Sequence, residues 1–473
     1  MTDLTKNSIS YRLKSAISGI GLPTLIIAVF WVLTLIGANQ VGISVQTLLS
    51  DTIKRAGMNG VLVLAMVPAI QSGVGPNFAL PIGIVCGLFA LVCAIEFDLL
   101  RESWLFASIL LSIPFAVFAG YIYGKLLNAV KGSEMTIATY TGFSIVALMC
   151  LVWLLIPFNS PKMGWFIGQG LRETVQLDTT GGAQILNNFL AINVGGEIII
   201  PVRSEDGEII VPTLTERVNT ITKENSTNTI IEKANSTVDI RNITIPSVIA
   251  GGIIPAFKVG DIRIPTLIGN RITIVKPKDI ELPKVIREGV YIVNREDEIP
   301  ATMKEATIPV IHGGVLIPTG LLLLFGFLAF LVSLFFKSRL GIAISAGGIN
   351  PKFAQAAGLN IDRSRILANI LSTVLGAIGI IVYSQSFGYA QLYTAPLMMA
   401  FPAVAAILIG GATASRANVL HVVLGVFLFQ GLLTSALPVA NEIFKGTDLS
   451  EIMRMMVQNG IILYALTQIK RGG

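Results

Sequence analysis

Uncharged polar side chains interrupt the apolar runs at two places, and these residues have the clearest potential to bind a ligand. The first interruption lies between apolar runs at 54–72 and 78–96, and the second follows an apolar run at 365–385. The candidate ligand-binding residues at both places are Gln71, Ser72, Asn77, Phe78, Gln385, Ser386 and Tyr389. Amide and hydroxyl groups can hydrogen-bond a small polar solute, and broken apolar segments at corresponding points of two halves are typical of transport sites. The alternative is that both interruptions are ordinary loops in water.

No pattern in the sequence predicts catalysis. The phosphate-binding pattern G-x-x-x-x-G-K-[S/T] is absent. The two histidines, His312 and His421, are far apart in sequence, which argues against a metal pair or a catalytic triad. Cys86, Cys93 and Cys150 lie in apolar runs, where they are interpreted as small buried hydrophobic residues. We therefore expect no catalytic residue, no metal site and no cofactor in this chain.

The long apolar runs determine the fold class. Of the 473 residues, 53% are hydrophobic and 13% are charged. About 20 consecutive apolar residues span the hydrocarbon core of a bilayer, so these runs predict a mostly α-helical, polytopic membrane bundle. The ten predicted spans are 20–40, 54–72, 78–96, 104–124, 138–157, 315–336, 365–385, 394–411, 418–437 and 452–468.

The distribution of basic residues indicates an orientation in the membrane. With the N-terminus inside, the inner loops carry Lys and Arg, as at 337–365 and 470–471, and the outer loops carry mixed or acidic sets. Lys54 and Arg55 run against this trend. Because basic residues accumulate on the cytoplasmic side, we expect a multi-pass protein of the cytoplasmic (inner) membrane with both termini inside. The net charge of +6 is interpreted as orientation, and no nucleic-acid partner is expected.

Residues 159–312 differ in character from the apolar runs. Segments rich in Ile, Val and Thr, such as EIIIPV and DIRIPTLIGNRITIV, alternate there with charged residues of both signs. Asp206-Gly207 and Gly269-Asn270 separate such segments and are turn signals. We therefore expect a β-rich extracytoplasmic insert at 159–312, between one transmembrane half at 1–158 and another at 313–473.

The stretch GGINPKFAQAAGLN, residues 347–360, predicts a short helix between two spans. Asn350 can cap the helix, Pro351 suits its first turn, and Gly358 suits the position just past its end. A helix of about seven residues is not stable alone in water. Its presence therefore needs an explanation in contacts with other surfaces.

The residue types of this helix predict where such a contact lies. Phe353 and Ala357 fall near one face, and Ala354 and Ala357 are three residues apart. Two alanines at this spacing would keep one side thin, so that another surface could approach closely. The alternative is an ordinary connector with capping residues.

Several segments resemble a known family. The frame G-x-N-P-x-x-A-x-x-A-G-L-N resembles the cytoplasmic coupling loop of ABC-importer permeases of the ribose, nucleoside and branched-chain amino acid type. The further segments that resemble this family are 164–170, 313–344, 406–433 and 459–471. The spacing Gly348-Ile349-Asn350 is closer to the nucleoside-type members, and QSGVGPNFALPIG at 71–83 lacks an acidic residue that sugar permeases usually carry there. The insert is not part of the usual family pattern.

The resemblance implies a role in transport. The chain would form the pathway for a small polar solute, sugar or nucleoside-like, and couple it to ATP hydrolysis on other subunits. The coupling loop would be 338–364, with contacts to the ATPase through Gly348, Asn350, Pro351, Phe353, Ala354, Ala357 and Gly358. The implied partners are ABC ATPase subunits that hold ATP and Mg, a second permease of the same or a related chain, an extracytoplasmic substrate-binding protein and the lipid bilayer. The insert would serve docking of the binding protein or assembly with the second permease.

Two other classes of protein remain open from the residues alone. An ion-coupled secondary transporter or channel with a sensory ectodomain would carry ionisable residues within its spans, and these spans contain very few. A membrane-anchored structural protein that displays the β-rich insert would need only one or two spans.

Overall fold

The structure is a computed structural model, and it describes most of the chain outside the predicted insert. The described residues are 22–99, 104–155, 174–177, 185–189, 191–194, 314–443, residue 460 and short strands between 197 and 312. The chain divides into two compact units. Unit 1 comprises residues 1–45, 55–185 and 323–473, and unit 2 comprises residues 46–54 and 186–322.

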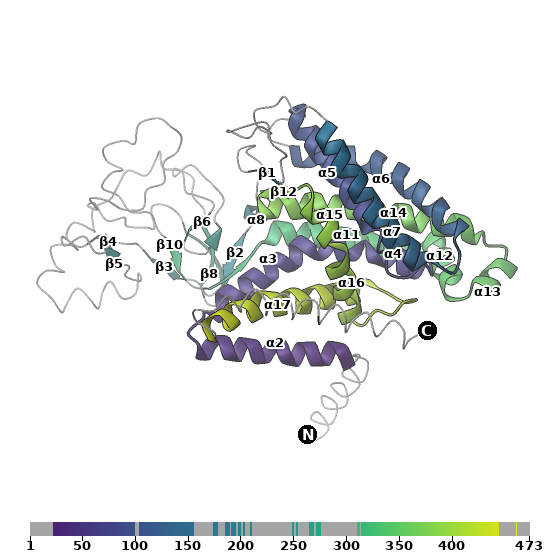
Figure 1. The fold of residues 1–473 in the computed structure, drawn as a ribbon. Helices are drawn as coiled ribbons and strands as arrows, with labels where there is room; N and C mark the ends of the chain where they lie inside the picture. The colour runs from purple at the N-terminus through teal and green to yellow at the C-terminus, as the bar shows by residue number, and fades with distance from the viewer. Residues whose placement is uncertain are drawn as a thin grey trace, which may run out of the picture. The chain divides into compact units, whose positions relative to one another are not determined.

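Helices account for most of the described residues of unit 1 (Figure 1). In chain order the described helices of the whole chain are α2 (Leu22–Gln40), α3 (Val45–Leu64), α4 (Met66–Gln71), α5 (Leu80–Glu96), α6 (Trp104–Ala129), α7 (Glu134–Leu155), α8 (Ile185–Asn188), α11 (Thr319–Lys337), α12 (Arg339–Ile349), α13 (Pro351–Ala356), α14 (Ile361–Phe387), α15 (Thr394–Met398), α16 (Ala400–Ile409) and α17 (Val419–Ile443). Within the described residues, six helical segments are long and apolar enough to cross a membrane, and four shorter apolar helices accompany them. The prediction of a polytopic helical protein is therefore confirmed.

The predicted spans agree with the helices except in their breaks and ends. Each span from 20–40 to 418–437 overlaps one or two helices, whereas 452–468 lies outside the described residues apart from residue 460, so the number of spans remains a prediction. Two predicted spans are each divided by a proline. Pro68 has no N–H for the carbonyl of Leu64, the last residue of α3, and Pro402 has none for Met398, the last residue of α15.

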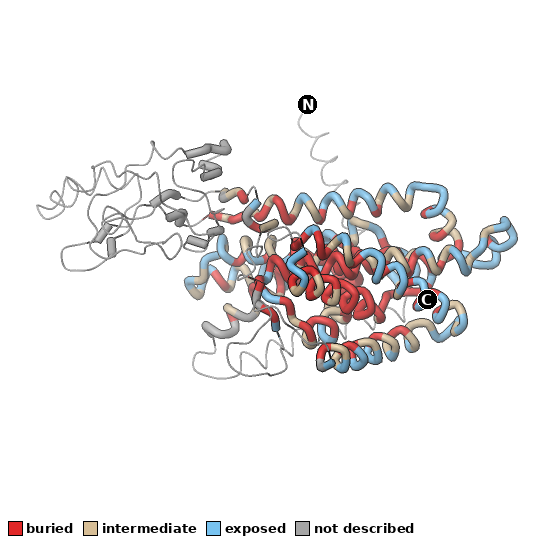
Figure 2. Tube along the Cα trace, turned by 90° about the horizontal axis from the view of Figure 1, so that it is seen from above, coloured by how far each residue is buried: buried red, intermediate tan, exposed pale blue. Residues whose placement is uncertain are grey.

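Helix α14 lies at the centre of unit 1 and packs closely on α5 and α6. Glycines on these two helices allow the backbones to approach. A Cβ at Gly87 would lie 2.4 Å from the carbonyl oxygen of Ala377, and one at Gly124 would lie 2.9 Å from the Cα of Ile366. Close packing through small residues replaces the hydrophobic effect as the force between helices in lipid. The buried positions accordingly gather in the middle helices (Figure 2).

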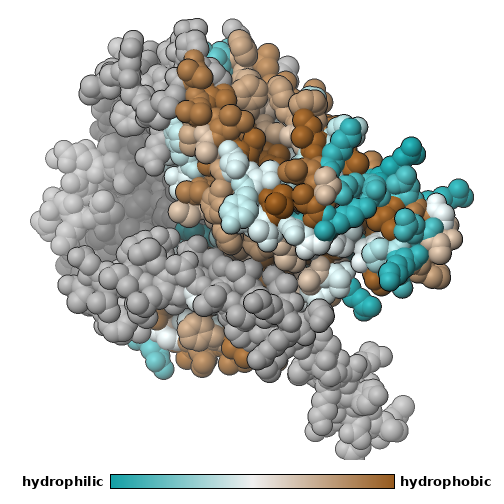
Figure 3. All heavy atoms as spheres, turned by 45° about the vertical axis from the view of Figure 1, so that its right-hand side comes forward, coloured by the Kyte–Doolittle hydropathy of each residue, from teal (hydrophilic) through white to brown (hydrophobic). Residues whose placement is uncertain are grey.

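The outer helices expose apolar side chains. Phe118 of α6 and Phe330 of α11 are among the large hydrophobic residues that remain exposed in the chain. Hydrophobic residues cover much of the side of the helices, whereas hydrophilic residues gather toward one end (Figure 3). This division is expected of a protein whose sides contact lipid and whose ends contact water.

Unit 2 contains a four-stranded sheet. The strand order is β11 (Val315–Ile317), β2 (Ile192–Val194), β8 (Ile264–Ile268) and β9 (Arg271–Val275), and only β2 and β8 pair in parallel. Ile268 lies opposite Arg271, so the predicted turn at 269–270 joins two paired strands. Shorter pairs are β3 (Glu197–Ile199) with β10 (Val310–His312), β4 (Val202–Arg203) with β5 (Ile209–Ile210), and β6 (Val248–Ile249) with β7 (Gly252–Ile253). The fold of the insert as a whole stays a prediction.

Two strands, β11 and β1, do not follow the predicted division between membrane spans and insert. β11 occupies residues predicted as the start of a span, and α11 begins only after Pro318, because the residue before a proline disfavours the helical conformation. β1 (Thr174–Gln176), from the predicted insert, pairs antiparallel with β12 (Tyr389–Gln391) within unit 1. The residues at 174–177 therefore pack with the helical unit.

Candidate functional site

The short helix α13 has the ends that the sequence predicts. The Asn350 side chain accepts a hydrogen bond from the N–H of Phe353 at 3.1 Å, and Pro351 is the first helical residue. Gly358 has a φ of +81° just past the helix, and its N–H donates to the Gln355 carbonyl at 3.0 Å. A left-handed residue here ends the helix without the strain that a Cβ would cause. The prediction of a capped helix is confirmed.

The structure contradicts the predicted contact face of α13 at one residue, Ala354. Ala354 is 0% exposed, because it packs against its own chain, so it cannot form a thin surface for a partner. Phe353 is 70% exposed, and Ala357 and Gly358 are also exposed. The side of α13 that a partner could contact is therefore the side that carries Phe353.

Gly348 lies against the turn that follows α4. A Cβ at Gly348 would lie 2.1 Å from the carbonyl oxygen of Gln71 and 2.7 Å from the nitrogen of Gly73. The Gln71 side chain accepts a hydrogen bond from the Ser345 hydroxyl and donates to the carbonyl of Ala417 at 2.6 Å. Gly348 is thus a packing residue within the chain, and the Gln71 amide binds two protein groups.

Asn77 belongs to a buried hydrogen-bond network. Its Nδ2 donates to the Ser372 hydroxyl at 2.9 Å, and its Oδ1 accepts from the Tyr123 hydroxyl at 3.1 Å and from the N–H of Ala79 at 3.0 Å. The Ser372 hydroxyl donates in turn to the carbonyl of Ala65, at the break between α3 and α4, at 2.7 Å. The Asn77 side chain therefore joins α6, α14 and the residues next to α5, and we interpret it as structural.

We expect Asn77→Leu to destabilise the helical unit. Each buried polar group left without a partner costs about 1–3 kcal/mol, and the substitution would remove the acceptor of the Tyr123 hydroxyl and of the Ala79 N–H. Ser372, in contrast, would keep its bond to the carbonyl of Ala65. Thermal unfolding in detergent measures the effect, with Asn59→Leu as the control, because the Asn59 amide donates only to the carbonyl of Arg55 on its own helix. An equal loss of stability in the two variants would contradict the structural role of Asn77.

The second group of candidate residues lies elsewhere along α14. Gln385 and Ser386 are buried near the end of this helix, the Gln385 amide donates to the Ser386 hydroxyl, and Tyr389 is partly exposed on β12. Ser372 and Gln385 are separated by about 20 Å along the helix axis at a rise of about 1.5 Å per residue. The structure therefore does not bring the two groups of candidate residues together.

Aromatic side chains accompany the second group. The rings of Tyr383 and Phe387 are stacked with centroids 5.5 Å apart, and the Tyr389 ring meets Phe387 edge-on at 5.9 Å. Phe387 and Tyr389 are both exposed. Aromatic faces can stack on the ring of a solute, and amide and hydroxyl groups can hydrogen-bond its substituents.

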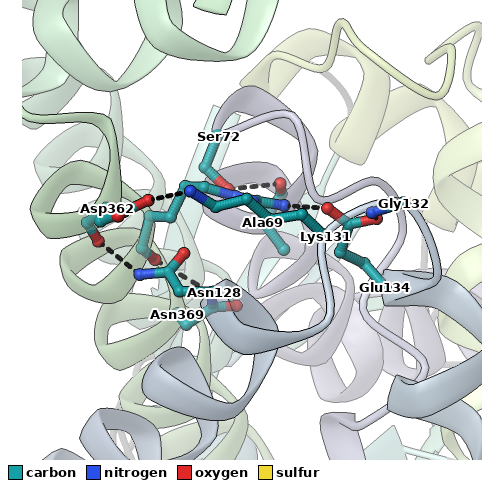
Figure 4. Close-up of polar contacts among 9 residues, drawn as sticks. Ala69, Ser72, Asn128, Lys131, Gly132, Glu134, Asp362 and Asn369 are labelled. Carbon is teal, nitrogen blue, oxygen red and sulfur yellow. Dashed lines mark hydrogen bonds and ion pairs between the residues drawn. The ribbon is translucent and has the colours of Figure 1, made fainter.

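A charged cluster near α13 was not predicted from the sequence. Arg365 forms an ion pair with Glu134, and both side chains are largely buried, at 8% and 17% exposed. The second carboxylate oxygen of Glu134 accepts from the N–H of Gly132 at 2.9 Å (Figure 4). From the sequence, Arg365 was expected only to be a basic residue of an inner loop. The sequence does place an arginine near the start of a long apolar helix. A charged side chain that is buried there needs an acidic partner, and this could have indicated an ion pair.

A second, exposed ion pair lies close by. Lys131 and Asp362 are 2.6 Å apart, each 54% exposed, and the Asn128 amide donates to the Asp362 carbonyl at 2.9 Å (Figure 4). Both pairs join the connection between α6 and α7 to the first turns of α14. They line a cleft of about 720 Å³ together with the turn after α4, the ends of α13 and the residues next to Gly348.

Part of the chain matches a family of permeases. Residues 266–466 match the family described as "Branched-chain amino acid transport system / permease component". This region contains α11 to α17, and so includes α13 and the residues around it. The resemblance to importer permeases that the loop carries is therefore confirmed.

Two curated relatives are similar over part of the chain. The galactofuranose transporter permease protein YtfT of Escherichia coli (strain K12) is 31% identical over 134 residues, which are 27% of this chain and 39% of that protein. The nucleoside ABC transporter permease protein NupB of Lactococcus lactis subsp. cremoris (strain MG1363) is 30% identical over 126 residues, 26% of this chain and 33% of that protein. The chain thus spans well under half the length of these relatives. No solved structure matches it significantly.

Proposed function

We propose that this chain is a permease subunit of an ABC importer in the cytoplasmic membrane. The observation that carries the proposal is α13, a capped helix with an exposed aromatic residue, in the region that matches the permease family. Phe353 offers a large apolar side chain to a partner, as the contacts that dominate protein interfaces do. The partner in this proposal is an ABC ATPase subunit that holds ATP and Mg, and α13 lies on the cytoplasmic side.

The rest of the assembly follows from this assignment. A second permease, of the same or a related chain, would complete the pathway, and an extracytoplasmic binding protein would deliver the solute. The insert would contribute to docking of that protein or to assembly of the two permeases. In this arrangement both termini of the chain are cytoplasmic.

The solute in this proposal is small, polar and ring-containing, a sugar or a nucleoside. The two relatives are named as permeases for galactofuranose and for nucleosides. The residue that would contact the solute is Tyr389, because its exposed ring lies beside the exposed ring of Phe387. Gln385 and Ser386 are fully buried and bound to each other, so they would support this end of α14 from within. Asn77 and Gln71 bind protein groups, so they would shape the pathway without contacting the solute.

Uptake by a reconstituted assembly tests the function. The chain is purified from native membranes with the subunits that accompany it and placed in liposomes that contain ATP and Mg. Labelled galactose, ribose, uridine and adenosine are then offered with the cognate binding protein, and liposomes that contain a non-hydrolysable ATP analogue serve as the control. We expect uptake of one class only with hydrolysable ATP. Uptake that follows an ion gradient without ATP would instead support an ion-coupled transporter.

A further inference from the structure

Helix α13 is attached to the rest of unit 1 on both of its sides. On the side of α12, Gly348 lies against the backbone of Gln71, whose side chain binds Ser345. On the side of α14, Arg365 binds Glu134, the first residue of α7. A displacement of α13 therefore acts on two neighbouring elements at once.

The attachment at Glu134 continues into the chain interior. Met135, the next residue of α7, lies against Gly75, where a Cβ would be 2.5 Å from the Met135 methyl carbon. Gly75 belongs to the loop between α4 and α5, and this loop leads to Asn77, which is bound to Ser372 of α14. Helix α14, the first turn of α7 and this loop are therefore each in contact with the other two.

The two ion pairs differ in how strongly they can stabilise the contacts among these three elements. Lys131 and Asp362 are each 54% exposed, so water and salt weaken their attraction. Arg365 and Glu134 are largely buried, and separating them would leave two charges without partners in a poorly solvated place. Glu134 is also favourably placed at the start of α7, where the helix dipole stabilises a negative charge.

We propose that Glu134 and Arg365 are positioning residues that form a rigid joint between α14 and α7, through which a movement of α13 reaches the loop at residues 72–77. Without the joint, the same movement would be absorbed between α13 and the start of α14, and it would reach the loop only through the contact of Gly348 with Gln71 and Gly73. The inference rests on the proposed function, because the movement of α13 is attributed to an ATPase subunit.

The distance between two spin labels, one on α7 and one on α14, tests the joint in a protein that keeps both Glu134 and Arg365. Cysteines are introduced at Thr136 of α7 and Arg363 of α14, both exposed, in a background where Cys86, Cys93 and Cys150 are alanine. We expect the distance distribution to be the same in the assembly with and without bound ATP, and to broaden or shift with ATP in Glu134→Gln. A nucleotide-dependent shift in the protein with the intact ion pair would overturn the joint.

The number of solutes taken up per ATP hydrolysed provides the functional test. We expect Glu134→Gln to lower this ratio about tenfold or more, whereas Lys131→Gln, which removes only the exposed pair, should change it less than about twofold. The exchange of charges in Glu134→Arg with Arg365→Glu should recover part of the ratio, because it restores the ion pair but not the hydrogen bond from the N–H of Gly132 or the negative charge at the start of α7. A normal ratio in folded Glu134→Gln would overturn the inference and leave the importer function intact.

The two proposals fail in different ways. If Glu134→Gln does not fold, the distance measurement on the unmodified pair still decides the question. If the wild-type assembly shows no ATP-dependent uptake and no associated ATPase, the proposed function itself is wrong.

Discussion

Replacing Gly348 with alanine is expected to reduce transport at least tenfold and to destabilise the protein, although alanine normally favours a helix. The added Cβ would lie 2.1 Å from the Gln71 carbonyl oxygen, which is a backbone atom and cannot rotate away. Helix α12 would have to move, and α13 would move with it. Overpacking of this kind costs about 1–3 kcal/mol. Thermal unfolding and ATP-dependent uptake measure the two effects.

The neighbouring residue provides a matched control. A Cβ at Gly347, in the same helix, would meet only a side-chain carbon of Ile361 at 4.0 Å. Gly347→Ala should therefore retain transport and gain up to about 1 kcal/mol from the helix propensity of alanine. If the two alanine variants behave alike, the close approach of α12 to the turn after α4 is not required for function.

Replacing Phe353 with aspartate should strongly weaken binding of the ATPase without unfolding the permease. Its side chain is exposed, so the folded chain loses little, but an interface would lose its aromatic residue. Loss of such a residue typically costs about 2–4 kcal/mol, or about 30- to 1000-fold in affinity. The measurement is the affinity of the detergent-solubilised permease for the purified ATPase, together with the melting temperature.

Ala354→Asp is the contrasting variant one residue away. Ala354 is fully buried, so a carboxylate there should lower the melting temperature strongly, and any loss of ATPase binding would follow from misfolding. A stable Ala354→Asp protein with reduced affinity would indicate that the opposite side of α13 contacts the ATPase.

The features that the sequence could predict are those determined by neighbouring residues. Asn350 and Gly358 act within one or two turns of α13, so the cap and the end of this helix were predictable. Apolar runs located the helices, but the division at Pro68 required attention to a missing N–H rather than to hydropathy. The side on which Ala354 lies was not predictable, because a six-residue helix with small residues on both sides has no distinct apolar face.

The contacts that define the candidate site join residues far apart in sequence. Glu134 and Arg365 are separated by 231 positions, and Asn77 and Ser372 by 295. The sequence around each of these four residues does not indicate which residue it contacts. Asn77 was therefore a candidate solute-binding residue because it is polar and interrupts an apolar run, whereas the structure shows partners for it within the chain.

Photo-crosslinking from position 353 tests whether α13 contacts an ABC ATPase subunit. A photoreactive phenylalanine derivative replaces Phe353, the chain is expressed in its native membranes, and the adducts formed on illumination are identified by mass spectrometry. The same residue at Phe330, an exposed position on α11, serves as the lipid-facing control. We predict an adduct between position 353 and an ABC ATPase subunit, and none from position 330. An active transporter that forms no ATPase adduct from position 353 would contradict the assignment of α13 as the coupling helix.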